Sequence, residues 1–569
     1  MQFRVLASAL VSVALMLAAC GPAGPAGLGT QDGGPAPTSA GKTLRIGTAL
    51  PDEPDPSTGG IGFNNKPAGY IFHSALAMYD PTTGELQPRI AERVPTLENG
   101  DWKTLPGGGM EVTWKLRPNA VWHDGTQLTA DDFVFGFKVG MDGDVFARGT
   151  AVLRTISDLT APDPHTLVVR WKENYIFANV MLKDTLVPLP RHLLADLYES
   201  GDKQAFAASP YHTTAWVGLG PYRLTQWLQG TFMEAEAFDR YFLGAPKIGR
   251  ISMRFFADTN TLLAIVMAGD VDVVPQGAFK QEEAQVLKAD WEPRGMGTVI
   301  LSWSDLRHAK PQWRYPDAPW VQDVRVRQAL VHMLDRQSVV DTLKGGISAV
   351  GDIPLLTEDP VYRLAQQRGL PSYPYDMARA QRLMAEAGLT RGPDGIFRTR
   401  DGEPFTMEVA ATADIASQIQ ELVVIADQWK SGGVAASPFP VPPSADRDKV
   451  RAEARGVIVR GLDLNYNGLR EFTSSEVSAE ANRWRGRNFG GYSNPAFDEQ
   501  VNRLLTTVQS TQREQIGADL FKKALEDVVW IPLWYGPDIL AARNSVRGVT
   551  KVSPAQDAVA WNIHLWEIN

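Results

Sequence analysis

The sequence has only one cysteine among its 569 residues, so an internal disulfide bond is excluded. This cysteine, Cys20, follows an apolar stretch that begins at Val5 and ends with Ala18 and Ala19. Arg4 and the amino terminus place positive charge before the stretch. The stretch is shorter than the roughly 20 apolar residues that a membrane-spanning helix needs. This pattern predicts a secretory signal peptide.

The residues around Cys20 resemble a bacterial lipobox, in which the cysteine becomes the lipid-bearing first residue of the mature protein. The alternative is an ordinary signal peptide that happens to contain a cysteine. Lipid attachment accounts better for Cys20, because a lone thiol in a secreted chain has no disulfide partner. Durable anchoring then requires more than one acyl chain. We therefore expect residues 1–19 to be a signal peptide and Cys20 to carry the lipid.

Large apolar side chains are almost absent from residues 20–42, where Gly, Pro, Ala, Ser and Thr dominate. Such a segment cannot bury enough apolar surface to offset the loss of chain entropy on folding. We expect a flexible linker that lets a folded body stand away from a membrane surface while it stays attached.

The rest of the sequence lacks a second long apolar run and lacks a basic block. No run after residue 42 approaches the roughly 18 apolar residues of a membrane span, so we expect a soluble body. The chain has 56 Lys and Arg against 65 Asp and Glu. Because no basic block is available to hold a phosphate backbone, nucleic acid is not an expected partner. The length after the linker predicts two or three domains.

Sequence motifs for catalysis are also missing. The chain has no Gly-x-Ser-x-Gly elbow, no phosphate-binding loop and no His-Glu-x-x-His helix, and its eight histidines show no i, i+4 pair. The adjacent pair His123 and Asp124 is typical of a turn, since neighbouring residues seldom face one reacting atom. We expect no catalytic residue, no cofactor and no metal ligand. Two alternatives stay open: distant histidines that meet in a cleft around nickel or a haem-like ligand, and a hydrolase whose two carboxylates face a sugar.

Alternating and helical periods both occur, which predicts a mixed α/β protein. Residues 251–256, 259–268 and 271–274 predict a strand, a short helix that ends at Gly269, and another strand. Later helices are expected after Asp376 and after Asn494, two residues that suit the position before a helix. Thr511 with Glu514 predicts a capping box for a fourth helix.

Several stretches resemble the family 5 extracellular solute-binding proteins, the peptide-binding type that delivers its ligand to an ATP-driven membrane importer. The strongest similarity lies in residues 114–135, which predict a strand, a turn and a helix capped by Thr129 and Asp132. That helix is expected to bury Phe133, Val134, Phe137 and Met141. Weaker matches follow in the family's order along the chain, at residues 218–222, 239–244, 268–272, 323–330, 378–388 and 491–498.

The resemblance implies the type II bilobed fold of periplasmic binding proteins, an α/β fold with an extra inserted domain. One lobe comprises residues 43–70, 185–298 and 530–569, the inserted domain comprises residues 71–184, and the other lobe comprises residues 299–529. Two chain crossings near residues 298 and 530 form a two-strand hinge. The lobes then close around a ligand in the cleft between them.

The function implied is that of the substrate-binding lipoprotein of an ABC importer. It captures a peptide or a solute of similar size and passes it to permease subunits that work with a separate ATPase. The expected location is the cell envelope, on the outer face of a membrane, and the expected state is a monomer. Within the same fold, an oligosaccharide, a metal chelate or a haem-type ligand is the alternative, and a secreted hydrolase is less favoured.

Ligand-contacting residues are expected in the second lobe. Peptide-binding relatives hold the amino terminus of a peptide with an aspartate in a stretch that corresponds to residues 460–467 here. Asp463 is the best candidate by position, with Asn465 beside it, but the usual Asp-Pro pattern is missing from this stretch. Asp463 is about as well explained as the cap of a loop.

Aromatic and basic residues complete the expected site. Trp484 offers a stacking face and Arg487 offers a fork for a carboxylate or a phosphate, although both also suit an exposed basic loop. Trp303 follows the expected hinge directly and is a candidate for the rim of the cleft. A packed surface position is the alternative for this tryptophan.

Overall fold

A computed structural model describes residues 41–50, 66–142, 145, 152–181, 186–413, 416–444, 446–551 and 560–569. Every described residue belongs to one compact unit, which lies within residues 39–569. The predicted signal peptide, Cys20 and most of the predicted linker lie outside the described residues.

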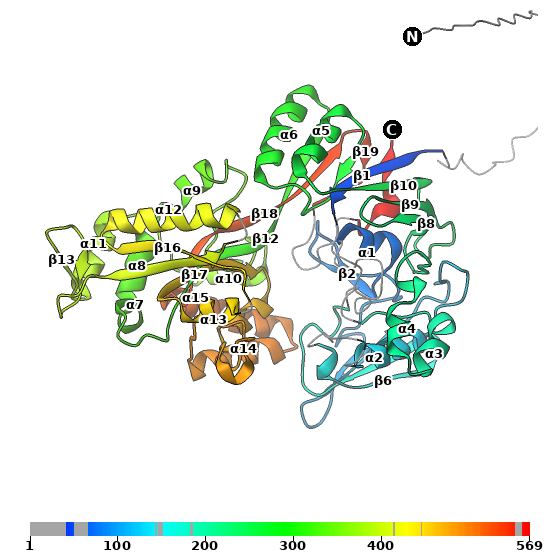
Figure 1. The fold of residues 1–569 in the computed structure, drawn as a ribbon. Coiled ribbons are helices and arrows are strands. Elements are labelled where there is room, and N and C mark those ends of the chain that lie inside the picture. Colours follow the sequence, from blue (N-terminus) through cyan, green and yellow to red (C-terminus); the bar gives the residue numbers. More distant parts are fainter. Residues whose placement is uncertain are drawn as a thin grey trace, which may run out of the picture. The chain divides into compact units, whose positions relative to one another are not determined.

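A ten-stranded mixed sheet runs through the described unit (Figure 1). In spatial order its strands are β16 (Ala435–Val441), β15 (Thr406–Thr412), β17 (Gly456–Asp463), β12 (Gly297–Pro311), β18 (Ile531–Arg543), β11 (Val273–Val274), β1 (Thr43–Ala49), β10 (Arg250–Phe256), β9 (Phe232–Ala237) and β8 (Tyr222–Leu228). The parallel strands β1 and β10 and the helix between β10 and β11 match the predicted strand–helix–strand unit, but β11 is only two residues long.

The two longest strands, β12 and β18, lie at the centre of this order. They pair antiparallel from Gly297 opposite Arg543 to Ala309 opposite Ile531. The register shifts twice, between Trp303 and Asp305 and again at the following Arg307–His308 step. Such irregularities leave a residue unpaired and re-aim the neighbouring side chains, so this pair is bent where it joins the two halves of the sheet.

Separate hydrophobic cores lie on the two sides of the central pair. The largest core gathers residues of β12, β15, β17 and the start of β18 with the helices that cover them. Two further cores surround β1 with β10 and β11 with β18. A fourth core fills the four-stranded sheet β4 (Trp102–Thr104), β5 (Met110–Lys115), β7 (Thr166–Trp171) and β6 (Ile156–Asp163). The division into lobes at residues 70, 184, 298 and 530 remains a prediction.

Helices cover the faces of these sheets. The α-helices are α1 (Lys66–Phe72), α2 (Ala130–Gly140), α3 (Arg191–Glu199), α4 (Lys203–Ala207), α5 (Thr259–Ala268), α6 (Gln281–Arg294), α7 (Pro319–Gln322), α8 (Val324–His332), α9 (Arg336–Thr342), α10 (Pro360–Gln367), α11 (Met377–Glu386), α12 (Ala416–Gly432), α13 (Arg447–Glu453), α14 (Pro495–Thr506) and α15 (Ser510–Glu526). The short two-stranded sheets pair β2 (Ala77–Tyr79) with β3 (Leu86–Pro88), β13 (Thr390–Arg391) with β14 (Phe397–Arg398), and β19 (Val546–Arg547) with β20 (Glu567–Ile568).

Most helix starts follow the local sequence. Asp376 accepts a hydrogen bond from the backbone N–H of Arg379 at 2.8 Å, and Asn494 accepts from those of Ala496 and Phe497. The capping box predicted at Thr511 and Glu514 is wrong, because α15 already begins at Ser510 and Thr511 lies inside its first turn. The helix therefore starts two residues earlier than a cap at Thr511 would place it.

The capping box of α2 is confirmed, with the backbone N–H of Thr129 donating to Asp132 at 2.9 Å. The predicted buried stripe of this helix is partly wrong. Phe133 is fully buried, but Met141 is 46 % exposed because it follows the last helical residue. Phe135 and Val139 are buried instead, so the core covers a different face of the last turn.

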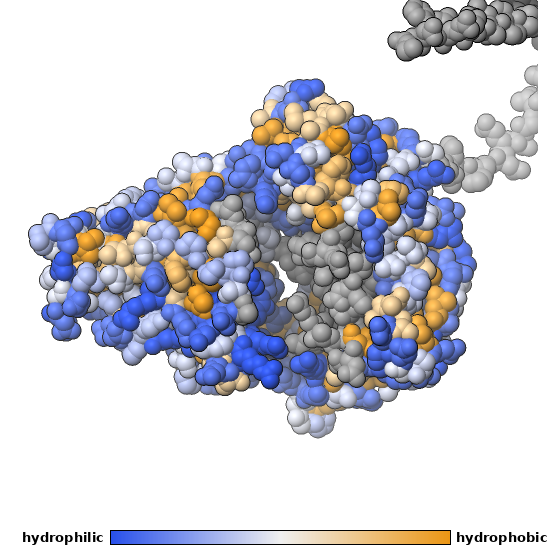
Figure 2. All heavy atoms as spheres, in the orientation of Figure 1, coloured by the Kyte–Doolittle hydropathy of each residue, from blue (hydrophilic) through white to orange (hydrophobic). Residues whose placement is uncertain are grey.

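No helix within the described ranges is both long and apolar enough to cross a membrane. On the face drawn in Figure 2, hydrophobic residues form small separate patches among hydrophilic ones. The internal cores hold nine fully buried tryptophans: Trp114, Trp122, Trp171, Trp291, Trp320, Trp429, Trp530, Trp534 and Trp566.

Candidate functional site

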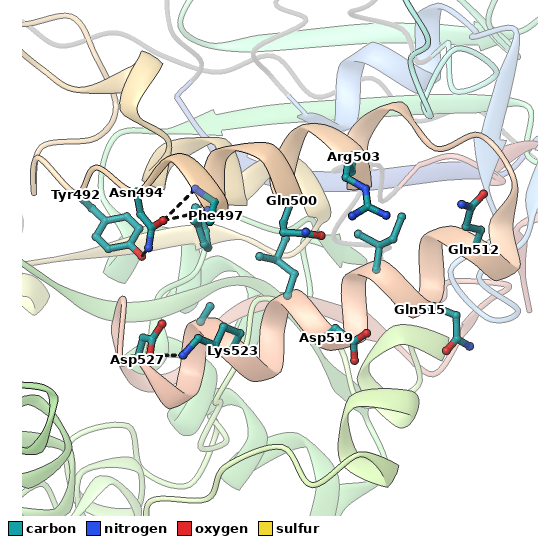
Figure 3. A pocket seen from close by; sticks show the side chains of 14 residues that line it. Tyr492, Asn494, Phe497, Gln500, Arg503, Gln512, Gln515, Asp519, Lys523 and Asp527 are labelled. Atoms are coloured by element: carbon teal, nitrogen blue, oxygen red, sulfur yellow. Dashed lines mark hydrogen bonds and ion pairs between the residues drawn. The ribbon is translucent and has the colours of Figure 1, made fainter.

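Two cavities stand out in the described part of the chain. The larger, of about 570 Å³, is a groove between α14 and α15 (Figure 3). Three of its charged side chains form ion pairs at largely exposed positions, Lys523 with Asp527 at 2.8 Å and Asp519 with Arg368 at 2.5 Å. Exposed ion pairs of this kind contribute little energy and need no ligand. The smaller cavity has the stronger claim to function, because charges lie buried around it.

This smaller cavity, the strand-end pocket, has a volume of about 280 Å³. The pocket lies where the parallel strands β15 and β17 separate after the pairing of Ala410 with Ile458. Its walls are Asp305, Arg307, Ala411, Thr412, Gln418, Arg451, Ile458, Val459, Arg460, Gly461 and Phe489. In open α/β sheets, ligands bind in the crevice outside the carboxyl ends of parallel strands. The position of the pocket in the sheet therefore predicts a binding site.

Asp305 is the unusual residue of this pocket. Its Oδ1 atom is buried and has no hydrogen-bond partner among the described residues. Glycines make room for the carboxylate, since a Cβ atom at Gly461 or Gly536 would collide with it. Burial raises the pKa of Asp305, and the attraction of Arg307 does not offset this effect. A carboxylate kept in such a place costs stability, which points to a functional reason for it.

A buried ion-pair network supports Arg307. Its Nη2 donates to Oε2 of Glu421 at 2.5 Å, and Nζ of Lys344 donates to Oε1 of the same carboxylate at 2.8 Å. Burial disfavours the charge on Glu421, but Arg307 and Lys344 outweigh burial and lower its pKa. Two cations thus share one carboxylate, which holds Arg307 in place at the wall of the pocket.

A second buried network lies on the neighbouring part of β12. Nζ of Lys310 lies 3.5 Å from the carboxylate of Glu471 and 4.3 Å from the ring centre of Phe472. Burial lowers the pKa of Lys310 to about 7, against the attraction of Glu471. Arg487, one of the predicted site residues, also pairs with Glu471 at 3.0 Å while its side chain stays 57 % exposed.

The structure places the other predicted residues around the pocket rather than in its wall. Trp303 is half-buried and stacks on Tyr535 with ring centres 6.0 Å apart. Asp463 is exposed at the end of β17 and stands directly opposite Asp305 in the strand pairing. Two carboxylates at paired positions repel each other, so the charge on one of these aspartates disfavours the charge on the other.

Asn465 and Trp484 have local structural contacts. The side-chain oxygen of Asn465 accepts a hydrogen bond from the backbone N–H of Asn467 at 2.9 Å, which caps a short 3₁₀ turn. Trp484 is half-buried in a small core with Phe489, and its backbone φ is +61°. Cations of Arg314 and Lys449 lie about 6 Å from its ring. A contact of either residue with a ligand stays a prediction.

The histidines do not form a metal site in the part of the chain that the structure describes, where no group of three His, Cys, Asp or Glu side chains could hold an ion. His123 accepts from the backbone N–H of Gly218 and its other ring nitrogen lies 3.0 Å from the carbonyl oxygen of Gly220. Burial lowers the pKa of His123 to about 4. Asp124 faces His192 instead, at 2.7 Å, so the adjacent pair does not act on one atom.

The sequence from residue 85 to residue 481 matches the family described as Bacterial extracellular solute-binding proteins, family 5 Middle. Because the match covers more than half of the chain, the protein belongs to this family of extracellular solute-binding proteins. The membership expected from the sequence motifs is confirmed.

Individual relatives are distant. The oligopeptide-binding protein AppA of Bacillus subtilis (strain 168) is 24 % identical over 481 residues, which are 81 % of this chain and 81 % of that protein. Protein XP55 of Streptomyces lividans is 28 % identical over 504 residues, with 87 % and 83 % covered.

Solved structures confirm the expected α/β bilobed fold. NikA from Brucella suis, in complex with Fe(III)-EDTA, matches with a TM-score of 0.73 and 18 % identity over 93 % of this chain and all of that one. AppA from Bacillus subtilis, in complex with a nonapeptide, matches with a TM-score of 0.64 and 20 % identity, with 93 % and 99 % covered. At such identities the similarity shows the fold and leaves the ligand open.

None of the residues that line the strand-end pocket is among the ligand contacts predicted from the sequence. Arg460 had one sequence indication, since it follows the apolar strand residues Val457 to Val459 and precedes Gly461. Asp305 had none, because its role depends on its pairing with a strand more than 150 positions away.

Proposed function

We propose that this protein is the substrate-binding component of an ABC importer and that it captures a peptide or a solute of similar size. Family membership supports this proposal, as do relatives named as oligopeptide-binding and ABC transporter peptide-binding proteins. The observation that carries the proposal is the strand-end pocket, a recess with buried charges on the strand that joins the two halves of the sheet.

In this proposal, the paired strands β12 and β18 act as the hinge. Only these two long strands connect the cores around β1 and β17 in the described sheet. The lobes defined by residues 43–70, 185–298 and 530–569 and by residues 299–529 close on the ligand, while residues 71–184 form the inserted domain. Closure converts binding free energy into a shape that the permease recognises. The ATPase and the permease are other chains.

Attachment to the membrane belongs to the same proposal. Cys20 carries the lipid, residues 20–42 form the linker, and the monomeric body faces the periplasm or the extracellular space. The linker keeps the receptor near its importer and so raises the effective concentration of one for the other without any new contact.

Native mass spectrometry of the purified protein tests ligand capture directly. We expect the protein to carry a non-covalent ligand whose mass corresponds to a peptide or a comparable solute. In a second arm, di- to oligopeptides, oligosaccharides and metal chelates are added, and the thermal unfolding midpoint is measured. A ligand at 100 times its Kd stabilises the native state by about 2.7 kcal/mol, which is a readily measured shift.

Two outcomes would contradict the proposal. One is the absence of any co-purified ligand together with no thermal stabilisation by any of the three ligand classes. The other is a product that accumulates with time in the same sample, which would show an enzyme. If metal chelates alone stabilise the protein, the ligand is a metal chelate, the alternative class for this fold, and not a peptide.

A further inference from the structure

Cations outnumber carboxylates on one side of the strand-end pocket. The buried carboxylate of Glu471 is shared by three cations: Arg487 at 3.0 Å, Lys310 at 3.5 Å and Arg460 at 3.7 Å. Because burial lowers the pKa of Lys310 to about 7, the permanent positive charges are those of Arg460 and Arg487, and one carboxylate cannot balance both. Arg460 lines the pocket and makes the longest of these three contacts. Its positive charge is therefore the least neutralised by Glu471.

Arg451 brings a second guanidinium to the same side. It bonds to the Thr412 hydroxyl and pairs at 3.1 Å with Asp448, a carboxylate whose side chain is 43 % exposed. Burial lowers the pKa of Arg451, and the positive charges of Arg447 and Arg460 add to this effect. The two pocket arginines therefore lie close enough to repel each other.

The ring of Phe489 fixes both arginines relative to the pocket. The guanidinium carbon of Arg460 lies 5.3 Å from the ring centre, and that of Arg451 lies 5.8 Å from it. Both arginines also line the same recess. Guanidinium forks of this kind match the oxygen atoms of carboxylate and phosphate groups.

The size of the pocket limits what it can take. A volume of about 280 Å³ lies just below the range in which whole drug-sized ligands are bound. The recess therefore suits one end of a ligand, with the remainder outside it.

We infer that Arg460 and Arg451 form a subsite for an anionic group of the ligand, a carboxylate or a phosphate, beside the ring of Phe489. This inference rests on the proposed function, since it names the chemical class of one end of the captured solute. An anion at this position neutralises the excess positive charge and relieves the repulsion between the two arginines. Asp305 lines the same pocket, and its negative charge disfavours an anion placed next to it.

Titration of simple anions tests the subsite without knowledge of the natural ligand. Inorganic phosphate and acetate are added separately to the purified protein in low-salt buffer, and binding is followed by calorimetry. We expect saturable binding of at least one anion and at least a tenfold loss of affinity in Arg460→Gln. The anion affinity of Arg460→Lys is expected to lie between those of the unmodified protein and Arg460→Gln, because lysine keeps the positive charge but lacks the guanidinium fork.

Arg382→Gln is the matched control, since it removes one exposed positive charge from α11 in the same lobe. It is expected to bind as the unmodified protein does. Arg451→Gln provides a second variant, so that misfolding of one variant, detected by its thermal unfolding, does not end the test. The inference is overturned if neither anion binds saturably, or if both pocket variants bind like the control.

A pair of peptides separates the two sources of negative charge. Trialanine carries a terminal carboxylate, and its amide does not. Preference for the free acid that disappears in Arg460→Gln identifies a carboxylate, and a response to phosphate alone identifies a phosphate. A neutral ligand found by native mass spectrometry, together with no anion binding, would sink this subsite and leave the proposed function standing.

Discussion

At the scale of single residues, Asp305 shows a conflict between stability and binding. Its carboxylate is buried, its Oδ1 atom has no partner among the described residues, and two glycines leave space for it. The raised pKa means that the native state disfavours the ionised form relative to the unfolded chain. A neutral side chain of the same shape removes this unfavourable contribution.

We therefore expect Asp305→Asn to be more stable than the unmodified protein at pH 7 by about 1 kcal/mol. The raised pKa sets the sign: the contribution of Asp305 is absent below the unfolded pKa of about 4 and becomes unfavourable as the pH rises through the native pKa. The gain should therefore fade as the pH falls toward 4. Urea unfolding at both pH values measures it, and Asp401→Asn, at an exposed position, is the control. Equal stability of the variant and the control at pH 7 would show that the charge is compensated.

Lys310 provides a separate test of buried charge. Its native pKa of about 7 lies below the value of about 10.4 in an unfolded chain. Between these two values the unfolded state binds the extra proton, so the free energy of unfolding rises with pH, by at most about 1.4 kcal/mol per pH unit. We expect Lys310→Met to lack this rise between pH 7 and pH 9. Urea unfolding across that range gives the slope, and parallel curves for the two proteins would contradict the assignment.

At the scale of helices and strands, Asn494 is a clear case of local control. Its side-chain oxygen accepts from two backbone N–H groups at the start of α14, those of Ala496 and Phe497. Asn494→Ala should destabilise the start of this helix by about 1 kcal/mol, because both donors lose their acceptor. Hydrogen exchange at Ala496 and Phe497 should accelerate, whereas Asn494→Ser, which keeps an acceptor, should preserve most of the protection. Unchanged exchange in the alanine variant would mean that packing of Phe497 alone defines the helix start.

The same scale shows what sequence can predict. The caps at Asp376, Asn494 and Thr129 depend on residues within three positions, so the sequence predicts them correctly. Thr511 fails because good capping chemistry does not prevent a helix from starting earlier. Family resemblance predicts the fold, since ordered motifs along the whole chain identify it.

The strand-end pocket cannot be predicted from the sequence, because its residues are far apart in the chain. Asp305, Gly461 and Gly536 come together only through the pairing of β12 with β17 on one side and β18 on the other. No local pattern encodes that register. The predicted residues Asp463 and Arg487 lie beside the pocket because they share its strand end and its charge network, and their contact with a ligand remains to be measured.

At the scale of the whole molecule, the proposed mechanism joins a hinged receptor to a membrane anchor. The strands β12 and β18 connect the two halves of the sheet, and the proposed linker of residues 20–42 connects the folded body to the lipid. Each connection serves a different step, since the hinge permits capture and the linker favours delivery. A change at Cys20 should therefore leave ligand affinity intact.

We expect Cys20→Ser to abolish lipid labelling and to release the protein from the membrane fraction, while the thermal stabilisation by ligand stays the same. The reason is that anchoring needs acyl chains on the thiol, and Cys20 lies outside residues 39–569, the unit that contains the strand-end pocket. Metabolic labelling with an alkyne fatty acid, followed by fractionation in high salt, measures both effects. The double variant Cys20→Ser/Ser39→Cys is the matched control, because it restores a thiol outside the processing site and should stay unlabelled. Labelling of this double variant would show that any exposed thiol is acylated, and membrane retention of Cys20→Ser would show that the apolar stretch from Val5 to Ala19 anchors the chain by itself.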